Sequence, residues 1–303
     1  MGAAFSSLPK RVTVVEVGPR DGLQNEAVSI PTAVKVAFVN ALSDAGLPAI
    51  EVTSFVRPES IPQLADAEDV MQSIDRKPGV RYPVLVPNER GLDRAVSAGA
   101  HEIALFTAAS ESFASHNINA TIAQSLERFA PVVERAKKMD MRVRGYVSTG
   151  FGCPYEGEVK PQAVIDVVGK LLALGIDEIS VGDTIGVATP TQVAQVCALL
   201  LRTVDPGRLA LHFHDTRGTA LANVVAGLLS GIAIFDSSAG GLGGCPYAPG
   251  AAGNLATEDL IYMLDGMGIQ TGVDLERVVQ ASLLIGAHLD HPLTSKYFQA
   301  ATS

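Results

Sequence analysis

Residues 32–54 read TAVKVAFVNALSDAGLPAIEVTS, and this stretch decides the fold. Its pattern predicts a helix over Thr32–Ala45, a helix-ending glycine at Gly46, and a strand over Ala49–Ser54. Glycine suits the end of a helix because it adopts the left-handed backbone conformation at little cost. The same unit of helix, glycine and strand recurs along the chain, and further predicted helices end before Gly99, Gly175 and Gly231.

Short apolar runs alternate with helical patterns throughout the chain. The predicted strands are Val12–Val17, Ala49–Ser54, Arg81–Val86, Glu102–Phe106, Arg142–Ser148, Glu178–Val181, Leu209–His214 and Ile232–Ser237. The predicted helices between them are Thr32–Ala45, Gly91–Ala98, Thr121–Lys138, Gln162–Leu174, Thr191–Thr203 and Leu221–Leu229. This alternation indicates a parallel sheet, and eight strands are the number that closes a barrel. We therefore expect an α/β fold, a (β/α)8 TIM barrel. The alternative, an open doubly wound sheet, lacks a glycine-rich dinucleotide turn after its first strand.

No linker rich in proline, serine or charge divides the chain, so we expect one domain over residues 1–303. Its barrel core should cover about residues 10–265, with a helical extension over 266–303. The longest loop, Ser238–Gly253, is rich in glycine, and a long loop in a compact domain usually has a function. The helical patterns after this loop are Asn254–Leu264 and one extra C-terminal helix, Asp274–Leu289.

Composition narrows the classes of partner. The chain has 23 basic and 32 acidic residues, a net charge of −9, and no basic stripe, so we expect no nucleic-acid partner. The uncharged segments Thr184–Leu201 and Gly218–Phe235 contain polar and helix-breaking residues, which favours buried core over membrane spans. The three cysteines, Cys153, Cys197 and Cys245, are too few for a disulfide framework and fit a reducing compartment. We expect a cytoplasmic protein.

The sharpest local motif is His212-Phe213-His214 at the end of the seventh predicted strand. Side chains alternate across a strand, so both imidazoles should point to the same face and could bind one divalent metal. Two hydrogen-bonded histidines in a polar cup are an equally open interpretation. Asp21, at the end of the first strand, could add a carboxylate or simply cap its turn. Asn254 could add a neutral oxygen or cap the following helix. Such ligands suit Mg²⁺ or Mn²⁺.

Two further residues could take part in chemistry. Arg20 precedes Asp21, and a guanidinium over a metal site would stabilise an enolate or carboxylate oxygen. It could instead lie at the surface or pair with Glu51 inside the barrel mouth. Cys245 lies on the glycine-rich loop and could act as an acid or base, whereas we expect Cys153 to be structural.

Five segments carry a resemblance to a known family. Residues 15–26 read VEVGPRDGLQNE, residues 182–186 GDTIG, residues 212–216 HFHDT, residues 241–248 GLGGCPYA and residues 253–259 GNLATED. Together they resemble the 3-hydroxy-3-methylglutaryl-CoA lyases, from about Lys10 to the last helix. The Arg-Asp pair and the His-x-His pair are also shared with a wider superfamily of metal-dependent aldol and Claisen barrels.

The resemblance implies a lyase that cleaves 3-hydroxy-3-methylglutaryl-CoA, or a closely related 3-hydroxyacyl-CoA, to acetyl-CoA and acetoacetate, as in leucine degradation. It implies an acyl-CoA substrate, a homodimer, and Mg²⁺ or Mn²⁺ held by Asp21, His212, His214 and Asn254. Arg20 would stabilise the enolate, Cys245 would transfer protons, Asp183 would join the proton relay, and Glu51 would hold Arg20.

The expected substrate-binding residues are Arg20, Gln24, Thr184 and Arg217. Arg217 departs from the family pattern, because the chain has Arg217-Gly218-Thr219 where the family often has Tyr-Gly-Gln. A cation at this position could change the acyl group that is accepted.

Two other functions remain open. One is a Claisen synthase of the same superfamily, which would condense acetyl-CoA with a 2-oxo acid and would share Arg20, Asp21 and the histidines. The other is a barrel that binds CoA or senses metal without catalysis, although a full set of candidate catalytic residues argues against it.

Overall fold

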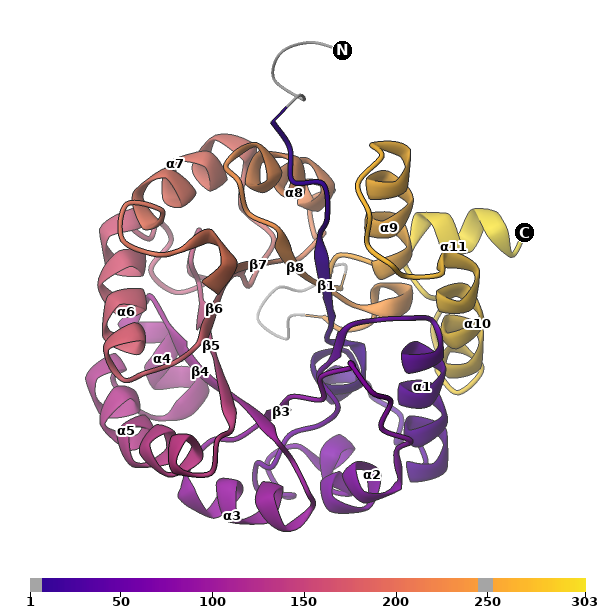
Figure 1. Cartoon of the computed structure of the whole chain (residues 1–303), viewed down its shortest axis with the longest axis horizontal. Helices are drawn as coiled ribbons and strands as arrows, with labels where there is room; N and C mark the ends of the chain where they lie inside the picture. The colour runs from indigo at the N-terminus through magenta and orange to yellow at the C-terminus, as the bar shows by residue number, and fades with distance from the viewer. Residues whose placement is uncertain (1–6, 245–252) are drawn as a thin grey trace.

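A computed structural model describes residues 7–244 and 253–303 of the chain. Eight parallel strands form one sheet that curls around a central axis, with helices on the outside (Figure 1). The strands are β1 Thr13–Glu16, β2 Ala49–Ile50, β3 Val84–Leu85, β4 Glu102–Ala108, β5 Arg142–Ser148, β6 Glu178–Asp183, β7 Leu209–Phe213 and β8 Ile234–Ser237.

The order of strands in the sheet is β2-β1-β8-β7-β6-β5-β4-β3. Isolated parallel bridges between Ala49 and Arg81, and between Ser54 and Leu85, then join the two outermost strands. The sheet is therefore closed into the barrel that the sequence predicted. Because the strands are parallel, all their carboxyl ends meet at one mouth of the barrel.

Helices surround the sheet and bury its outer face. They are α1 Thr32–Asp44, α2 Ala67–Ser73, α3 Glu89–Ser97, α4 Glu111–Ile118, α5 Ile122–Lys138, α6 Pro161–Ala173, α7 Pro190–Leu200, α8 Ala220–Leu229, α9 Thr257–Gly266, α10 Leu275–Gly286 and α11 Lys296–Ala301. The main apolar core lies between this helical layer and the sheet. A second, small apolar cluster comprises Val15, Val17, Ala49, Ala210 and Ile234. Ala210 is on the same face of β7 as His212, so this cluster lies inside the barrel.

The structure corrects several predicted boundaries. The strands at 49–54 and 81–86 are regular over only two residues each. Pro83 has no N–H to donate, and pairing continues there as isolated bridges and single hydrogen bonds. The sequence pattern also missed α2, α4 and α11, all eight residues or shorter, which leaves little room for a helical period.

The helix predicted over 254–264 begins three residues later, at Thr257, because Asn254 and Leu255 pair with the end of β7. The extension has two helices, α10 and α11, instead of the single one predicted. In Figure 1, α10 lies beside α1 at the edge of the ring. The division into core and extension stays a prediction.

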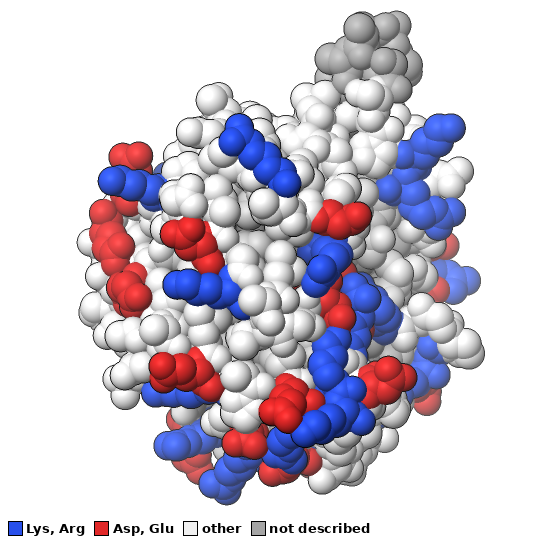
Figure 2. Space-filling model, turned by 60° about the vertical axis from the view of Figure 1, so that its left-hand side comes forward, with Lys and Arg blue, Asp and Glu red and all other residues white. Residues whose placement is uncertain are grey.

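The glycines predicted to end helices do so. Gly46, Gly99, Gly175 and Gly231 all have φ between +80° and +93°. Within the described residues, no helix combines the length and hydropathy needed to cross a bilayer. On the face drawn in Figure 2, basic and acidic side chains are interspersed, so this face carries no extended basic patch.

Candidate active site

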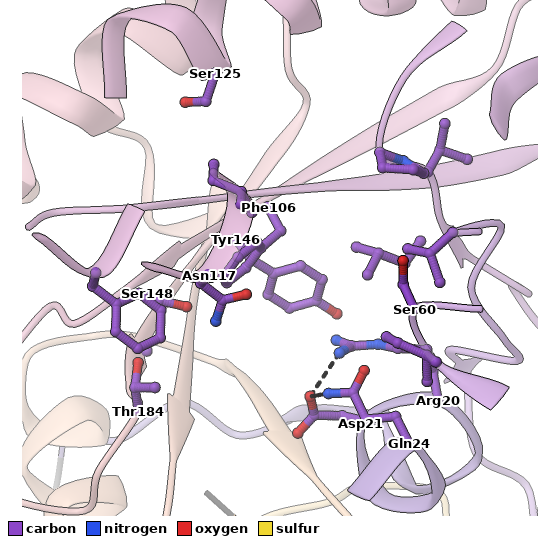
Figure 3. A pocket seen from close by; sticks show the side chains of 18 of the residues that line it. Arg20, Asp21, Gln24, Ser60, Phe106, Asn117, Ser125, Tyr146, Ser148 and Thr184 are labelled. Atoms are coloured by element: carbon purple, nitrogen blue, oxygen red, sulfur yellow. Dashed lines mark hydrogen bonds and ion pairs between the residues drawn. The ribbon is translucent and has the colours of Figure 1, made fainter. Parts of the chain in front are cut away.

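A cavity of about 1090 Å³ opens at the carboxyl ends of the strands. Several of the predicted site residues line it. Figure 3 shows three of them, Arg20, Asp21 and Gln24, beside the ring of Tyr146. The predicted residues in the lining are Arg20, Asp21, Gln24, Thr184, His212 and His214. Glu51, Asp183, Arg217 and Asn254 are described but are not part of the lining. Cys245 lies outside the described residues.

Asp21, His212 and His214 form a group with the geometry of a metal site. One ligand atom from each residue lies within 4.8 Å of the others. The two imidazole centroids are 5.2 Å apart, which confirms that both histidines point to one face of the strand end. In the part of the chain that the structure describes, this is the single cluster of three or more potential His, Cys or carboxylate ligands.

A π-helical turn explains how Arg20 and Asp21 both reach the cavity. The turn spans Gly18–Gly22, directly after β1, and the N–H groups of Arg20, Asp21 and Gly22 all donate to the carbonyl of Val17. This geometry removes the alternation of a strand. The Arg20 guanidinium then donates to Asp21 Oδ1 at 2.6 Å, as the dashed line in Figure 3 shows.

Asn254 lies behind Asp21. Its Nδ2 donates to Asp21 Oδ2 at 2.9 Å and to the carbonyl of Leu242 at 3.0 Å. Its Oδ1 is buried without a hydrogen-bond partner, as is Nδ1 of His214. Buried acceptors are rarely left unsatisfied. A divalent cation would satisfy the amide oxygen, so the donor set fits a metal. The alternative that Asn254 caps a helix is wrong, since α9 begins at Thr257.

The electrostatics suit metal binding. Burial raises the pKa of Asp21, but the charges of Arg20 and the two histidines more than reverse this and bring it to about 2. Burial and the neighbouring His212 lower the pKa of His214 to about 4. Near neutral pH the site therefore offers an ionised carboxylate and a neutral imidazole, which are the forms that coordinate metals.

Arg20 pairs with Glu51 inside the barrel mouth, which is one of the interpretations that the sequence left open. Its Nε donates to Glu51 Oε2 at 2.8 Å, and Glu51 is fully buried. The Tyr146 hydroxyl donates to the same Oε2 at 3.0 Å, and the guanidinium carbon lies 5.4 Å from the centre of the Tyr146 ring. Glu51 therefore acts on the cavity through Arg20, and does not line the cavity itself.

Sequence reasoning missed a buried ionic network beneath the site. Arg144 is 1% exposed, and its guanidinium lies 2.6 Å from Asp236 Oδ1 and 2.8 Å from Glu178 Oε1. It also donates to the Tyr146 hydroxyl at 3.0 Å. Asp236 Oδ2 lies 3.3 Å from Nδ1 of His212. The sequence did contain a signal for this network. Arg144 and Asp236 each lie within a mainly apolar strand, at a position whose side chain points into the barrel by alternation.

The structure gives Asp183 a structural environment. Its Oδ1 and Oδ2 accept from the backbone N–H groups of Val187 and Ala188, both at 2.9 Å, and the residue is 0% exposed. Burial raises its pKa to about 6 despite these two hydrogen bonds. Both carboxylate oxygens thus hold the loop after β6.

Arg217 serves the same loop. Its guanidinium donates to the carbonyls of Ile185 and Gly186 at 2.8 and 2.9 Å. Thr184, between Asp183 and these carbonyls, does line the cavity, and its hydroxyl accepts from the N–H of Thr149 at 2.8 Å. The predicted substrate contact of Arg217 therefore has no direct support in the geometry.

A parallel barrel with Asp, His and His at its carboxyl mouth, next to an arginine fixed by Glu51, defines the class: a barrel enzyme with a candidate site for a divalent metal. A family model described as HMGL-like matches residues 11–285. The chain belongs to this family.

Named relatives and a solved structure of high similarity support this family assignment. A cytoplasmic 3-hydroxy-3-methylglutaryl-CoA lyase of Rattus norvegicus is 54% identical over 297 residues, which cover 98% of this chain and 87% of the relative. A mitochondrial hydroxymethylglutaryl-CoA lyase of Rattus norvegicus is 51% identical over 298 residues, covering 98% and 92%. The structure of an HMG-CoA lyase from Acinetobacter baumannii, in complex with coenzyme A and 3-methylmalate, superposes with a TM-score of 0.92 at 41% identity and covers 99% and 96% of the two chains.

Proposed function

We propose that the chain is a hydroxymethylglutaryl-CoA lyase that cleaves 3-hydroxy-3-methylglutaryl-CoA to acetyl-CoA and acetoacetate. The observation that carries the proposal is the cluster of Asp21, His212 and His214 within 4.8 Å, with the Arg20 guanidinium 2.6 Å from Asp21. Membership of the HMGL-like family supports the same reaction.

The proposed ligands of the metal are Asp21, His212, His214 and Asn254, and the proposed ion is Mg²⁺ or Mn²⁺. Oxygen and imidazole donors suit these ions. When bound, such an ion supplies positive charge that lowers the pKa of the tertiary hydroxyl of the substrate.

The proposed role of Arg20 is to stabilise the enolate that forms when the carbon–carbon bond breaks. Once the hydroxyl has lost its proton, the carbon–carbon bond breaks and its electron pair moves onto the thioester carbonyl. A guanidinium fixed by Glu51 is preorganised to donate hydrogen bonds to that enolate oxygen. Glu51 and Tyr146 are positioning residues in this scheme, since both act through Arg20.

A proton must then reach the acetyl carbon, which balances the one that left the hydroxyl. Cys245 stays our candidate for this transfer, and Asp183 an indirect one through the loop that it holds. A Cys245→Ser variant should lose most of its turnover and keep its metal content. Loss of metal from that variant would argue for a structural cysteine.

The cavity extends well beyond the metal group. Its further lining includes Arg57, Ser60, Asn117, Asn119 and Arg128, which are polar or cationic. Two arginines suit the phosphates of coenzyme A, because a guanidinium binds phosphate oxygens in pairs. Gln24 donates to Asp21 Oδ1 at 3.0 Å and lies beside the reacting end. We propose that Gln24, Thr184, Arg57 and Arg128 bind the acyl-CoA.

The test is an assay of the Mn²⁺-loaded protein on a panel of 3-hydroxyacyl-CoA thioesters. We expect acetyl-CoA release, and a loss of about 10³-fold or more in Asp21→Ala and His212→Ala, because several kcal/mol of charge stabilisation disappear. Retained turnover in both variants would refute the metal assignment. Thiol release from acetyl-CoA and a 2-oxo acid, without cleavage, would favour the Claisen synthase.

Cellular location and assembly remain proposals. The rat relatives are named cytoplasmic and mitochondrial, and we propose a cytoplasmic homodimer that acts in leucine degradation. Cell fractionation and sedimentation of the purified chain would test the two statements separately.

A further inference from the structure

Residues 240–243, which are three glycines and Leu242, form a thin layer next to the candidate ligand Asn254 and the turn that carries Asp21. Gly240, Gly241 and Gly243 have φ values of +70°, +72° and +103°. A Cβ atom at Gly243 would lie 2.7 Å from Asn254 Nδ2 and 3.3 Å from the Cα of Gly22. The inner side of this layer therefore touches the amide of one candidate ligand and the turn that carries Asp21.

The outer side of the same layer is covered by the segment between α10 and α11. The N–H groups of Thr294 and Ser295 both donate to the carbonyl of Gly240, at 2.9 and 3.1 Å. The Thr294 hydroxyl donates to the carbonyl of Gly241 at 3.2 Å. A Cβ at Gly240 would lie 2.8 Å from the Leu293 side chain, which is buried. Glycine is favoured at position 240 because its φ is positive and because a side chain there would overlap the Leu293 side chain.

One ion pair joins this segment to Glu26, which follows the Gly18–Gly22 turn and the short 3-10 turn after it. His291 Nε2 lies 2.7 Å from Glu26 Oε2, and His291 Nδ1 lies 3.1 Å from the carbonyl of Pro292. Both ring nitrogens face acceptors, which favours the doubly protonated, cationic imidazole. The hydrogen bond to Glu26 raises the pKa of His291 accordingly. Glu26 is buried, and its carbonyl accepts from Gln63 Nε2 at 2.7 Å.

These contacts reach the candidate metal site from two sides. From the outside, residues 293–295 press on Gly240 and Gly241, and the layer in turn contacts Asn254. On the other side, His291 contacts Glu26, which lies five residues after Asp21 and directly follows the 3-10 turn Leu23–Asn25. A ligand set keeps its affinity only if its surroundings fix the ligand positions.

We propose that residues 291–295, which we name the C-terminal strap, are a positioning element of the metal site. The strap holds the glycine layer against Asn254 and the Asp21 turn, and His291 is the residue that latches it. This inference rests on the proposed metal assignment but not on the identity of the substrate.

The test compares the full-length variants His291→Gln and Leu293→Ala with His288→Gln as a matched control. His288 is an exposed histidine just after α10, three residues from His291. Mn²⁺ affinity is measured without substrate, by the electron paramagnetic resonance signal of the free ion. Thermal melting and amide exchange of residues 240–243 are measured on the same samples.

We expect Mn²⁺ affinity to fall about 3- to 30-fold in His291→Gln and Leu293→Ala, with faster exchange at residues 240–243, and to change less than twofold in His288→Gln. A merely structural contact would lower the melting temperature and leave the affinity unchanged, which would overturn the proposal. Leu293→Ala removes core packing and could unfold the chain; His291→Gln alters an accessible ring and keeps the test decisive.

The two proposals fail in different ways. If the wild-type chain binds no Mn²⁺, the metal assignment and the strap proposal both fall. If the wild type binds Mn²⁺ and both strap variants bind it equally well, only the strap proposal falls. If Mn²⁺ binding depends on the strap but no 3-hydroxyacyl-CoA is cleaved, the strap stands and the substrate assignment falls.

Discussion

Replacing Asp236 by asparagine tests whether the buried network beneath the site supports metal binding. Asp236 Oδ2 lies 3.3 Å from Nδ1 of His212, and Oδ1 lies 2.6 Å from the Arg144 guanidinium. Burial raises the pKa of this carboxyl, but the charge of Arg144 and the hydrogen bond from His212 lower it below its ordinary value. Asp236→Asn keeps the size of the side chain and removes its negative charge.

Asp236→Asn should lower two quantities, the affinity for the metal and the free energy of unfolding. A carboxylate behind a metal-ligating imidazole typically contributes about 10- to 100-fold in metal affinity, or about 1.4 to 2.8 kcal/mol. Breaking a buried ion pair costs about 3–5 kcal/mol of folding stability. Arg144 keeps Glu178 at 2.8 Å, so we expect the lower end of that range. Both effects should be visible in one variant.

The assay is a Mn²⁺ titration of Asp236→Asn, with Ser180→Ala as the control. Ser180 donates to Asp236 Oδ2 at 2.7 Å, so its removal costs about 1 kcal/mol of stability without changing the charge behind His212. We expect Ser180→Ala to bind Mn²⁺ within twofold of wild type. A folded Asp236→Asn protein with wild-type Mn²⁺ affinity would refute the reasoning.

Three other substitutions test separate parts of the structure. Burial raises the pKa of Glu258 from 4.5 to about 7. The folded state therefore holds its proton more tightly, so unfolding free energy should fall as pH rises from about 4.5 to about 7, and Glu258→Gln should flatten this slope in urea titrations. Arg217→Gln should change kcat/KM for the acyl-CoA less than threefold, because its guanidinium donates to loop carbonyls; a loss above tenfold would restore a direct substrate contact. Gly241→Ala should lower the free energy of unfolding by about 1–2 kcal/mol or more in thermal melts, since φ is +72° and the added Cβ would overlap Thr294. The control Gly79→Ala, at φ +82° in open space, should lose only the free energy that a positive φ costs an alanine backbone.

The barrel and its metal group could be predicted because their signals are local. A helix-ending glycine and a short apolar strand are each recognised within a few residues, and eight predicted strands that alternate with helices leave few folds to choose from. The His-x-His motif fixes a common face by alternation alone. Asp21 followed once the barrel placed the ends of β1 and β7 on one rim.

The buried network could not be predicted because it depends on register between strands. Arg144 is the Cα partner of Glu178, and His212 is the Cα partner of Asp236. The sequence contains all four residues, but nothing local says that they are level with one another. A shift of one residue would turn each side chain to the other face of the sheet.

Asp183 and Arg217 show a different limit. Both follow strand ends where catalytic residues are expected, and both have the right chemistry. Their side chains instead satisfy backbone groups of the loop after β6, at distances of 2.8 to 2.9 Å. Whether a polar residue at a strand end faces substrate or its own loop is decided by the backbone path of the turn that follows.

The polar interior of this barrel connects the two halves of the site. Barrel interiors are commonly filled by branched apolar residues, but here Arg144 lies at the centre, and a buried charge is costly unless it is paired. Pairing is achieved by carboxylates beside each arginine, with the neutral Tyr146 hydroxyl between them. Arg20 contacts Glu51, Glu51 contacts the Tyr146 hydroxyl, and Tyr146 contacts Arg144.

From Arg144 the network continues through Asp236 to His212. The guanidinium proposed to stabilise the enolate and the imidazole proposed to bind the metal are thus the two ends of one chain of polar contacts. Moving Arg20 would break its buried ion pair with Glu51, which costs several kcal/mol, and moving His212 would break its contact with Asp236. The polar interior is therefore what preorganises the two halves of the site relative to each other, before any substrate or metal is bound.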